Sequence, residues 1–278
     1  MRFTKMHGLG NDYIYVNCLH ETVENPAKLA VKLSDRHFGI GSDGLILIKP
    51  SALADFEMDI YNADGSRAQM CGNGIRCVGK YVYDKGLTKK KSLDIETLAG
   101  IKHLELTVQD EKTEQVIVEM GSPKFLASEI PVRTEEREMI NAPLTVNGKQ
   151  YPVTCLSVGN PHCVVFLKEE VKNLDLPSLG PAFERHEKFP ERINTEFVNI
   201  LDRKTIRMRV WERGSGETLA CGTGACAAAA AAMANQLTED EVTAQLLGGD
   251  LTVRWNQKEN QIYMTGKAVT VFDGEIDI

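Results

Sequence analysis

The chain has 278 residues, of which 42% are hydrophobic and 26% are charged. This is ordinary globular composition, with enough apolar surface for one large domain or two smaller ones. The formal net charge of −7 argues against a nucleic-acid-binding protein, because such proteins normally present a basic face. An anionic substrate remains compatible with this charge, since a site can be locally positive inside an acidic protein.

The sequence carries no signal for secretion or for membrane insertion. No apolar stretch of signal-peptide type follows Met1, and the longest run of small apolar residues, 225–234, is far too short to span a bilayer. Seven cysteines, an odd number, indicate reduced thiols in a chain of this length. We therefore expect a cytoplasmic protein that binds neither membrane nor nucleic acid.

In the first half of the chain, two segments predict helices. Residues 26–37 begin with Pro26 at an N-terminal helical position, and residues 74–85 are followed by Gly86 as a C-cap. The remaining periodic segments of this half predict strands, bounded by turn residues. They are two short strands within 2–18, then 45–48, 56–62, 92–97, 101–108 and 115–120.

The second half repeats this rhythm after a candidate boundary at Gly121-Ser122-Pro123. An alanine-rich helix is expected at about 222–235, and we expect it to be buried because it carries almost no polar stripe. Many strands with one principal helix per half predict an α+β protein. The strands expected here are 151–158, 162–167, 196–201, 204–211, 250–256, 260–265 and 267–272.

Two short segments resemble each other and lie half a chain length apart. One is Cys71-Gly72-Asn73-Gly74 and the other is Cys221-Gly222-Thr223-Gly224, and both run directly into a predicted helix. An internal duplication, with a cysteine at the start of the main helix of each half, accounts for both segments most economically.

The start of a helix is a specific chemical environment. It offers unpaired N–H groups and partial positive charge, so it binds carboxylates and favours a thiolate. Making a cysteine mostly thiolate at neutral pH requires a pKa shift of roughly two units, or about 2.7 kcal/mol. The helix dipole supplies at most about 2 kcal/mol. Hydrogen bonds or a nearby histidine are therefore expected to supply the rest.

Metal-binding and redox roles for the cysteines fit their spacing less well. Separations of six residues (Cys71 and Cys77) and five residues (Cys221 and Cys226) differ from zinc-knuckle spacing and do not share a helix face. A CxxC redox pair and a phosphate-binding loop with its lysine are both absent. A thiol redox or metal-binding protein remains the non-isomerase alternative. The thiols expected to be inert in apolar strands are Cys18, Cys155 and Cys163.

The combined motifs resemble the diaminopimelate epimerase family nearly from end to end. Together they are far more specific than either Cys-Gly-x-Gly segment alone. They are Lys5-Met6-His7-Gly8-Leu9-Gly10-Asn11-Asp12, Asn62-Ala63-Asp64-Gly65-Ser66, Cys71-Gly72-Asn73-Gly74, Gly159-Asn160-Pro161-His162, Phe189-Pro190-Glu191-Arg192, Glu212-Arg213-Gly214 and Cys221-Gly222-Thr223-Gly224.

The resemblance implies a fold and an activity. The fold is α+β, with two pseudo-symmetric domains that each wrap a mainly antiparallel β-sheet around a central helix. The N-terminal half-domain would comprise 1–119 plus 267–278, and the C-terminal one 120–266. The implied reaction interconverts LL- and meso-diaminopimelate, in lysine and cell-wall precursor biosynthesis, without pyridoxal phosphate, another cofactor or a metal. A homodimer is also implied, with the active site where the two helix starts meet.

The resemblance also assigns roles to residues. Cys71 and Cys221 match the catalytic acid and base, while His162 and Glu212 resemble residues that tune them. Gly72, Asn73, Gly222 and Thr223 match the backbone that holds a carboxylate. The residues that resemble substrate contacts are Asn11, Asn62, Asn160, Asn194, Glu212 and Arg213.

One departure from the family and one alternative activity stand beside this assignment. Gly44 occupies a position where some family members have a glutamine that contacts the substrate, so that contact must be missing or replaced. His162 at a strand end and the charges of Glu212 and Arg213 are also compatible with a structural role or a solvated surface. The alternative within the same fold is a racemase or isomerase that acts on another amino acid.

Overall fold

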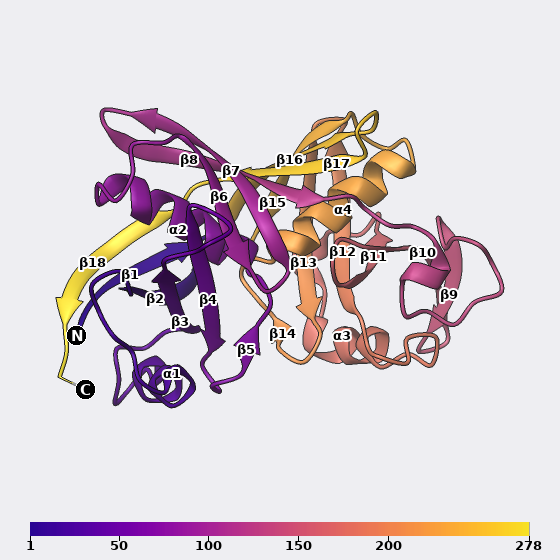
Figure 1. The fold of residues 1–278 in the computed structure, drawn as a ribbon. Coiled ribbons are helices and arrows are strands. Elements are labelled where there is room, and N and C mark those ends of the chain that lie inside the picture. The colour runs from indigo at the N-terminus through magenta and orange to yellow at the C-terminus, as the bar shows by residue number, and fades with distance from the viewer. Residues whose placement is uncertain (278) are drawn as a thin grey trace. The chain divides into compact units, whose positions relative to one another are not determined.

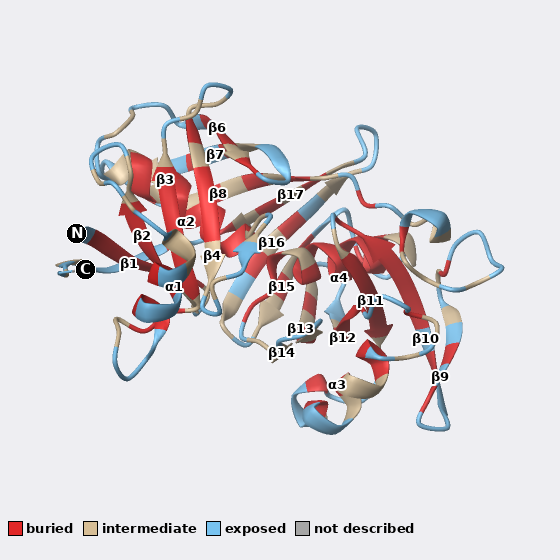
Figure 2. Ribbon diagram, turned by 60° about the horizontal axis from the view of Figure 1, so that its bottom comes forward, coloured by how far each residue is buried: buried red, intermediate tan, exposed pale blue. Residues whose placement is uncertain are grey.

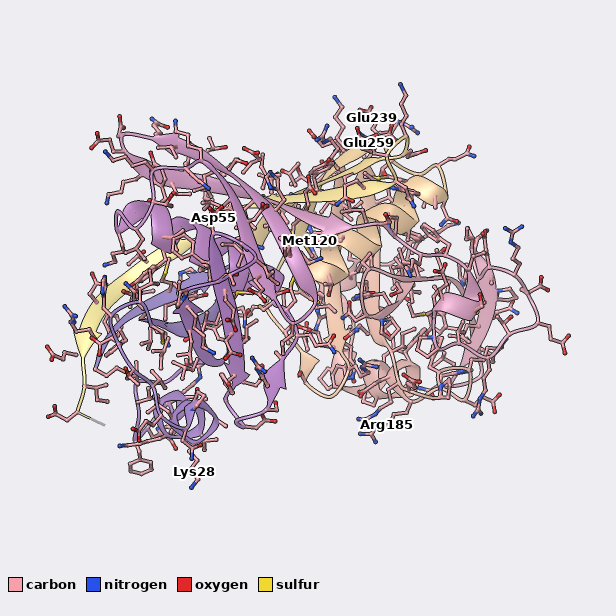
Figure 3. All side chains as sticks on the ribbon, in the orientation of Figure 1. Lys28, Asp55, Met120, Arg185, Glu239 and Glu259 are labelled. Carbon is pink, nitrogen blue, oxygen red and sulfur yellow. The ribbon has the colours of Figure 1, made fainter. Side chains whose placement is uncertain are left out.

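The computed structural model describes residues 1–277 as two compact units (Figure 1). Unit 1 contains Met1–Glu119 and the chain from Thr265 onward, and unit 2 contains Met120–Met264. Sheet strands and few helices build both units, so the predicted α+β class is confirmed. Charged side chains such as Lys28, Arg185 and Glu259 are exposed and point outward (Figure 3).

Unit 1 is a mixed sheet with two helices. The strands pair in the order β18–β1–β2–β3–β4–β6–β7–β8, in which β2–β3 and β4–β6 are parallel and the other neighbours are antiparallel. The helices are α1 (Pro26–Ser34) and α2 (Gly72–Asp84). The strands are β1 (Arg2–Gly8), β2 (Asn11–Asn17), β3 (Gly44–Lys49), β4 (Phe56–Asn62), β5 (Arg67–Ala68), β6 (Ser92–Thr97), β7 (Gly100–Gln109), β8 (Lys112–Gly121) and β18 (Val269–Glu275).

The helices of unit 1 cover the sheet through apolar side chains. Leu29 and Leu33 of α1 join a buried cluster with Ile14 and Leu45 of the neighbouring strands. Helix α2 contacts β1, β2 and β7, and its first eight residues are buried. The last strand, β18, lies antiparallel to β1, so the chain ends of unit 1 are neighbours.

Unit 2 has the same kind of sheet around a second central helix. Its strands pair in the order β9–β10–β11–β12–β13–β15–β16, with parallel pairs β11–β12 and β13–β15. The helices are α3 (Leu176–Glu184) and α4 (Gly222–Ala234), and the short 3-10 turns are Ala127–Glu129 and Val171–Asn173. The strands are β9 (Ala142–Val146), β10 (Lys149–Ser157), β11 (Pro161–Phe166), β12 (Asn194–Asp202), β13 (Thr205–Glu212), β14 (Gly216–Glu217), β15 (Glu241–Leu246), β16 (Gly249–Asn256) and β17 (Gln261–Gly266).

The two units repeat one order of elements. In each, an antiparallel pair is followed by a helix, a parallel partner, an antiparallel partner, a short strand and the central helix. This makes β2 equivalent to β11, β3 to β12 and α2 to α4. The register agrees, because Tyr13 pairs with Gly44 in unit 1 as His162 pairs with Asn194 in unit 2.

The alanine run of α4 is buried, as its lack of a polar stripe predicts. Residues 225–232 are completely buried, and the helix contacts six strands of its unit, β10, β11, β12, β13, β15 and β16. Figure 2 shows α4 and the neighbouring β10 and β11 mostly in the colour of buried residues. Small side chains let the strands approach the helix closely from several directions.

The structure corrects several element predictions. The helix predicted over 26–37 ends at Ser34, because Asp35 has a non-helical ψ of 124° and its carboxylate accepts the N–H groups of His37 and Phe38. The helix predicted from Gly74 begins at Gly72, since Cys71 caps it.

Several elements were not predicted: helix α3, strands β9 and β15, the two-residue strands β5 and β14, and the two 3-10 turns. Helix α3 contains Pro177 and Pro181, which give its sequence a low helix propensity.

Among residues 1–277, no helix combines the length and the apolar character needed to cross a bilayer.

We expect Ala230→Leu to destabilise the protein, because the new side chain has no room in α4. Overpacking a filled core costs about 1–3 kcal/mol of unfolding free energy. Met233→Leu in the same helix is the control, since a swap of similar volume costs less than about 1.5 kcal/mol. Urea unfolding followed by circular dichroism measures both. Equal stability of Ala230→Leu and the parent would contradict the close packing around α4.

Candidate active site

Each of the two repeated cysteines is the N-cap of its unit's central helix. Cys71 and Cys221 have extended backbones with φ of −137° and −119°, and each Sγ accepts a hydrogen bond from the N–H three residues later. The distances from Sγ to the nitrogens of Gly74 and Gly224 are both 3.3 Å. The sulfurs therefore occupy the place where serine or aspartate oxygens usually cap a helix.

In unit 1, an asparagine touches the thiol and is itself held by an aspartate. The Cys71 thiol donates to Asn11 Oδ1 at 3.3 Å, and the Asn73 amide donates to the same oxygen at 3.3 Å. The Asn11 amide nitrogen donates to Asp43 Oδ2 at 2.8 Å. Arg36 in turn donates to Asp43 Oδ1 at 2.9 Å. Because Asp43 accepts from the Asn11 amide nitrogen, the amide oxygen of Asn11 points at the sulfur of Cys71.

The surroundings of Cys71 include donors and a positive charge, but burial dominates its protonation. Burial raises the pKa of the Cys71 thiol, and this outweighs the lowering by the N–H groups of Gly74 and Asn73, the Tyr13 hydroxyl and the charge of Arg76. Arg76 is fully buried in the first turns of α2, where it donates to the Gly72 carbonyl at 3.0 Å. Further along the same helix, burial raises the pKa of Cys77 to about 11.

Asn62 and Gly44 lie opposite each other on β4 and β3, at one end of the sheet of unit 1. The Asn62 amide donates to Ser66 Oγ at 3.0 Å, so this side chain is engaged within its own turn. A Cβ atom at Gly44 would lie 2.2 Å from the Tyr61 carbonyl oxygen and 2.9 Å from the Tyr13 ring. The backbone packing here therefore excludes a glutamine side chain at Gly44.

In unit 2, the thiol is flanked by carboxylates instead of a guanidinium. Burial, followed by the charges of Glu212 and Glu196, raises the pKa of Cys221 well above its ordinary value. Hydrogen bonds with Thr223 and the N–H of Gly224 act in the opposite direction. Glu212 accepts a hydrogen bond from the Thr218 hydroxyl, which holds its carboxylate at the end of β13.

His162 belongs to a buried polar cluster of unit 2. Its Nδ1 lies 2.7 Å from Glu196 Oε1, and its Nε2 lies 2.8 Å from Asn160 Oδ1. The side chains of His162 and Glu196 are completely buried. The structure thus brings the predicted residues His162 and Asn160 together, and it adds a carboxyl group that the sequence prediction did not include.

Asn194 and Arg213 hold the loops that carry this cluster. The Asn194 amide donates to the Pro161 carbonyl at 2.8 Å, and its oxygen accepts the backbone N–H of Arg213 at 2.9 Å. The Arg213 guanidinium donates to the Glu191 carbonyl at 3.2 Å on the exposed side of the loop. Asn194, at the start of β12, therefore links the start of β11 to the turn after β13, and its role as a substrate contact stays a prediction.

The sequence prediction missed four polar residues near the cysteines and the direction of the pKa shifts. The missed residues are Tyr13, Asp43, Arg76 and Glu196. Charged residues within apolar strand or helix runs were the available signal for the last two. The lowered thiol pKa expected at a helix start is wrong for both cysteines, because desolvation of the charged form exceeds the help from the N–H groups.

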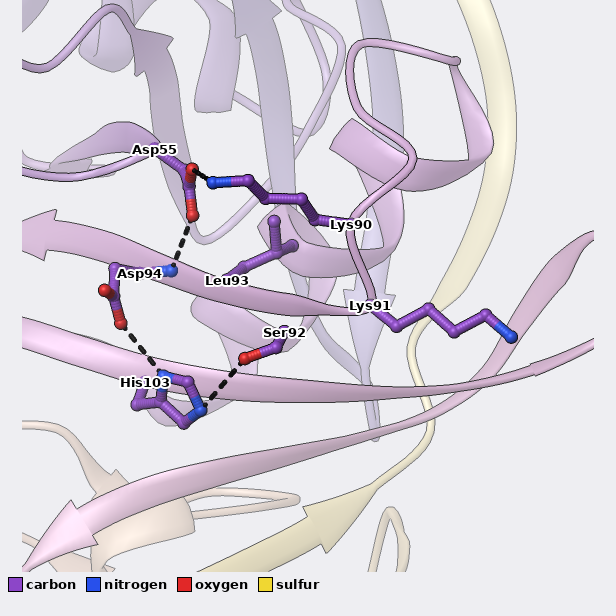
Figure 4. Close-up of a pocket in the computed structure, with 7 residues that line it drawn as sticks. All are labelled: Asp55, Lys90, Lys91, Ser92, Leu93, Asp94 and His103. Atoms are coloured by element: carbon purple, nitrogen blue, oxygen red, sulfur yellow. Dashed lines mark hydrogen bonds and ion pairs between the residues drawn. The ribbon is translucent and has the colours of Figure 1, made fainter.

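Within residues 1–277, no group of three or more histidine, cysteine or acidic residues is arranged to hold a metal ion. A separate pocket of about 440 Å³ lies on unit 1, and none of the predicted site residues lines it (Figure 4). The charged residues that line this pocket pair with one another. Lys90 contacts the Asp55 carboxylate, and His103 Nδ1 lies 2.9 Å from Asp94 Oδ1. This pairing leaves few charges free to hold a ligand there.

Comparisons with known proteins agree on one family. The family model described as diaminopimelate epimerase matches residues 3–126 and 154–271. A diaminopimelate epimerase of Acetivibrio thermocellus is 59% identical over 100% of this chain and 99% of its own length. One of Methanococcus maripaludis is 56% identical, with 100% of both chains covered.

Solved structures with low identity share the fold. A probable proline racemase from Agrobacterium radiobacter superimposes with a TM-score of 0.71 at 16% identity, covering 100% of this chain and 93% of that one. A phenazine biosynthesis protein of the PhzF family from Bacillus anthracis gives 0.69 at 20% identity, covering 100% and 99%. At these identities the likeness describes the fold alone.

We expect iodoacetamide to alkylate Cys71 before Cys221 in the reduced native protein at mildly alkaline pH. Cys71 is partly exposed and lies near Arg76, whereas Cys221 is 6% exposed and lies beside two carboxylates. Peptide mass spectrometry over a time course measures the order. Cys77 is the internal control, and its pKa of about 11 predicts no reaction. Faster labelling of Cys221 would contradict this charge asymmetry.

Glu212→Gln is expected to speed the alkylation of Cys221 at fixed pH. Removing the negative charge lowers the pKa of this thiol, and each pKa unit changes the thiolate fraction about tenfold, so a severalfold rise is expected. The rate at Cys71, in the other unit, serves as the reference. An unchanged or slower reaction at Cys221 would show that Glu212 does not act on this thiol through its charge.

Proposed function

Because this chain belongs to the diaminopimelate epimerase family, we propose that it interconverts LL- and meso-diaminopimelate without a cofactor, with Cys71 and Cys221 as acid and base. The observation that carries this proposal is the repeated cysteine N-cap. Two units of one chain each place a thiol at the positive end of the central helix, within 3.3 Å of a backbone N–H. Inversion of one stereocentre needs two such proton-transfer groups.

The reaction moves one proton off Cα and another proton on. A thiolate Sγ takes the Cα proton and becomes a thiol, and the electron pair of the broken C–H bond remains on the substrate as a carbanion. The other thiol then gives its proton to the opposite face and becomes the thiolate. The thiols exchange roles in the reverse direction, so the chemistry requires both to reach the same Cα.

The carbanion needs electrostatic help, because an amino-acid Cα–H is a very weak acid. We propose that the first N–H groups of α2 and α4, at Gly72, Asn73, Gly222 and Thr223, bind the substrate α-carboxylate. Helix-start N–H groups have no partner within the helix, and they face anions favourably. As negative charge moves toward this carboxylate in the transition state, such fixed donors stabilise it without reorganisation.

The substrate also changes the charge around Cys221. Glu212 opposes ionisation of this thiol. An α-ammonium group placed beside Glu212 would offset that negative charge and lower the pKa of the thiol. The proposed role of Glu212 is therefore to hold the reacting amino group and to couple its arrival to thiolate formation.

The distal end of diaminopimelate carries a second ammonium and a second carboxylate. Arg213 is the proposed partner of that carboxylate, since a guanidinium binds a carboxylate in bidentate geometry. Its backbone is fixed by Asn194. The packing at Gly44 leaves no room for the family glutamine, so that contact is missing or supplied by another residue. The proposed neutral contacts along the substrate are Asn11, Asn62, Asn160 and Asn194.

We further propose that the chain consists of two half-domains, 1–119 plus 267–278 and 120–266, that arose by duplication. The matching order of strands and helices in the two units supports this. A cytoplasmic homodimer in lysine and cell-wall precursor biosynthesis completes the proposal. Strand β18 supports a dimer, because it leaves Val269, Val271 and Phe272 exposed on unit 1.

Proton NMR of the reduced protein with LL-diaminopimelate in deuterated water tests the activity. We expect loss of the Cα–H signal together with appearance of the meso isomer, without added cofactor. Zinc chelation should leave the rate unchanged. Absence of both exchange and epimerisation, with the thiols shown to be free, would overturn this substrate assignment.

Replacing either catalytic thiol should abolish epimerisation, since each isomer needs both an acid and a base. We expect Cys71→Ala and Cys221→Ala each to lower kcat at least about a hundredfold. Cys18→Ala is the control, because that thiol follows β2 and lies at neither helix start. Normal turnover in Cys221→Ala would contradict the two-thiol mechanism but not the epimerase activity.

A further inference from the structure

A carboxyl group that no sequence motif singled out is buried beside the predicted tuning residue of unit 2. Glu196 lies on β12, completely buried, with its Oε1 2.7 Å from His162 Nδ1. Its second oxygen, Oε2, has no hydrogen-bond partner among residues 1–277. A buried carboxylate with one unsatisfied oxygen is costly, so packing alone does not account for this side chain.

The hydrogen bonds of the imidazole determine where protons lie. The Asn160 Oδ1 atom can only accept, so the His162 Nε2, 2.8 Å away, carries a proton. At Nδ1 two arrangements are then favourable. Either Nδ1–H donates to an ionised Glu196, or a protonated Glu196 donates to Nδ1. Both place one proton between Nδ1 and Oε1, and both leave the pair without net charge.

The internal repeat shows that this position does not need a polar side chain. Ile46 on β3 is the equivalent of Glu196, since each lies two residues beyond the equivalent Gly44 and Asn194. A Cβ at Gly74 would lie 2.7 Å from Ile46 Cδ1, and a Cβ at Gly224 would lie 2.8 Å from Glu196 Oε1. The same framework thus packs an isoleucine against one helix start and a glutamate against the other.

Several titratable groups face Glu196 from the surrounding elements. They are His162 and Cys163 on β11, Glu212 at the end of β13 and Cys221 at the start of α4. Burial raises the pKa of Glu196, and the charge of Glu212 adds to this, while His162 opposes it. A second full negative charge here would hinder thiolate formation at Cys221, and a proton shared with His162 cancels it.

We propose that Glu196 is a positioning residue that shares one proton with His162, fixing the imidazole and keeping this side of Cys221 free of a second negative charge. The catalytic consequence rests on the proposed epimerase function, whereas the shared proton does not. With one proton between Nδ1 and Oε1, His162 keeps its Nε2–H directed at Asn160 while Cys221 alternates between thiol and thiolate.

Proton NMR with ¹⁵N-labelled histidine tests the shared proton independently of activity. We expect a far-downfield resonance coupled to a ring nitrogen that stays unchanged from about pH 6 to about pH 9, a range over which an ordinary histidine loses its second ring proton. His162→Gln identifies the signal among the six histidines. The signal should vanish in Glu196→Gln, because an amide can hydrogen-bond the ring but, unlike a carboxyl group, cannot exchange a proton with it.

Epimerase kinetics test the positioning role. In Glu196→Gln we expect kcat to fall roughly 10- to 100-fold, as for small misplacements of catalytic groups, with a much smaller change in KM. Glu196→Ile, which copies the residue of unit 1, should fold and show the same loss. Thr195→Val is the matched control on the same strand, since Thr195 is buried and its hydroxyl has no partner within residues 1–277. It should retain both the resonance and the rate.

The outcomes separate this inference from the proposed function. A missing resonance in the parent protein, or one that persists in Glu196→Gln, would overturn the shared proton whatever the enzyme does. Loss of the resonance with unchanged kcat would overturn the positioning role. Equal losses of kcat in Thr195→Val and Glu196→Gln would show that the strand tolerates no change, which also overturns it. A parent protein inactive on diaminopimelate would refute the proposed function. The resonance would then still show whether Glu196 and His162 share a proton.

Discussion

The structure depends on a sulfur atom taking the place of an oxygen at the start of a buried helix. A thiol caps a helix more weakly than a hydroxyl, so the first turn must come close enough for its N–H to reach Sγ. The residue whose N–H reaches Sγ is a glycine in both units, and an added Cβ there would collide with a strand residue, Ile46 in unit 1 and Glu196 in unit 2. The cap thus constrains both the helix sequence and the strand facing it.

Once the caps are fixed, the two units differ mainly in the charges around the sulfur. Arg76 lies near Cys71, while Glu196 and Glu212 lie near Cys221. Cys221 is buried and Cys71 is partly buried, and desolvation raises the pKa of both thiols. The backbone around the two sulfurs is repeated. The two units therefore differ in the sign of the charged side chains near each sulfur, and only a few residues make this difference.

Much of the framework could be predicted from the sequence, because its signals are local. Each of these signals has a direct physical effect on the structure near it. They are the alanine run of α4, the turn residues between strands and the repeated Cys-Gly-x-Gly segments. Helix α3 could not be predicted in this way, since Pro177, Gly180 and Pro181 oppose a helix locally and the cluster around Phe183 stabilises it. Its N-cap Asp175 was the signal available.

The candidate site was predictable in part for the same reason. The cysteines, glycines and asparagines stand in motifs, and the structure gathers Asn11 and Asn73 at Cys71. Glu196 stands alone in an apolar strand, and its meaning depends on His162, which is distant in sequence. The direction of the thiol pKa shifts also escaped prediction, because desolvation depends on tertiary burial and not on the position of a residue in a helix.

The asymmetry between the two sulfurs fits the chemistry that a two-base isomerase requires. Such an enzyme works from a state with one thiolate and one thiol, and two identical surroundings would make that state one of several with similar free energy. A duplication within one chain removes this restriction, because each copy can change separately. Placing Arg76 near the sulfur of one unit and Glu212 near the sulfur of the other keeps the repeated cap geometry while giving the two sulfurs different proton affinities. The proton held by the Glu196–His162 pair keeps a second negative charge away from Cys221. The proton affinities of the two sulfurs therefore stay close enough for Cys221 to ionise when the reaction reverses.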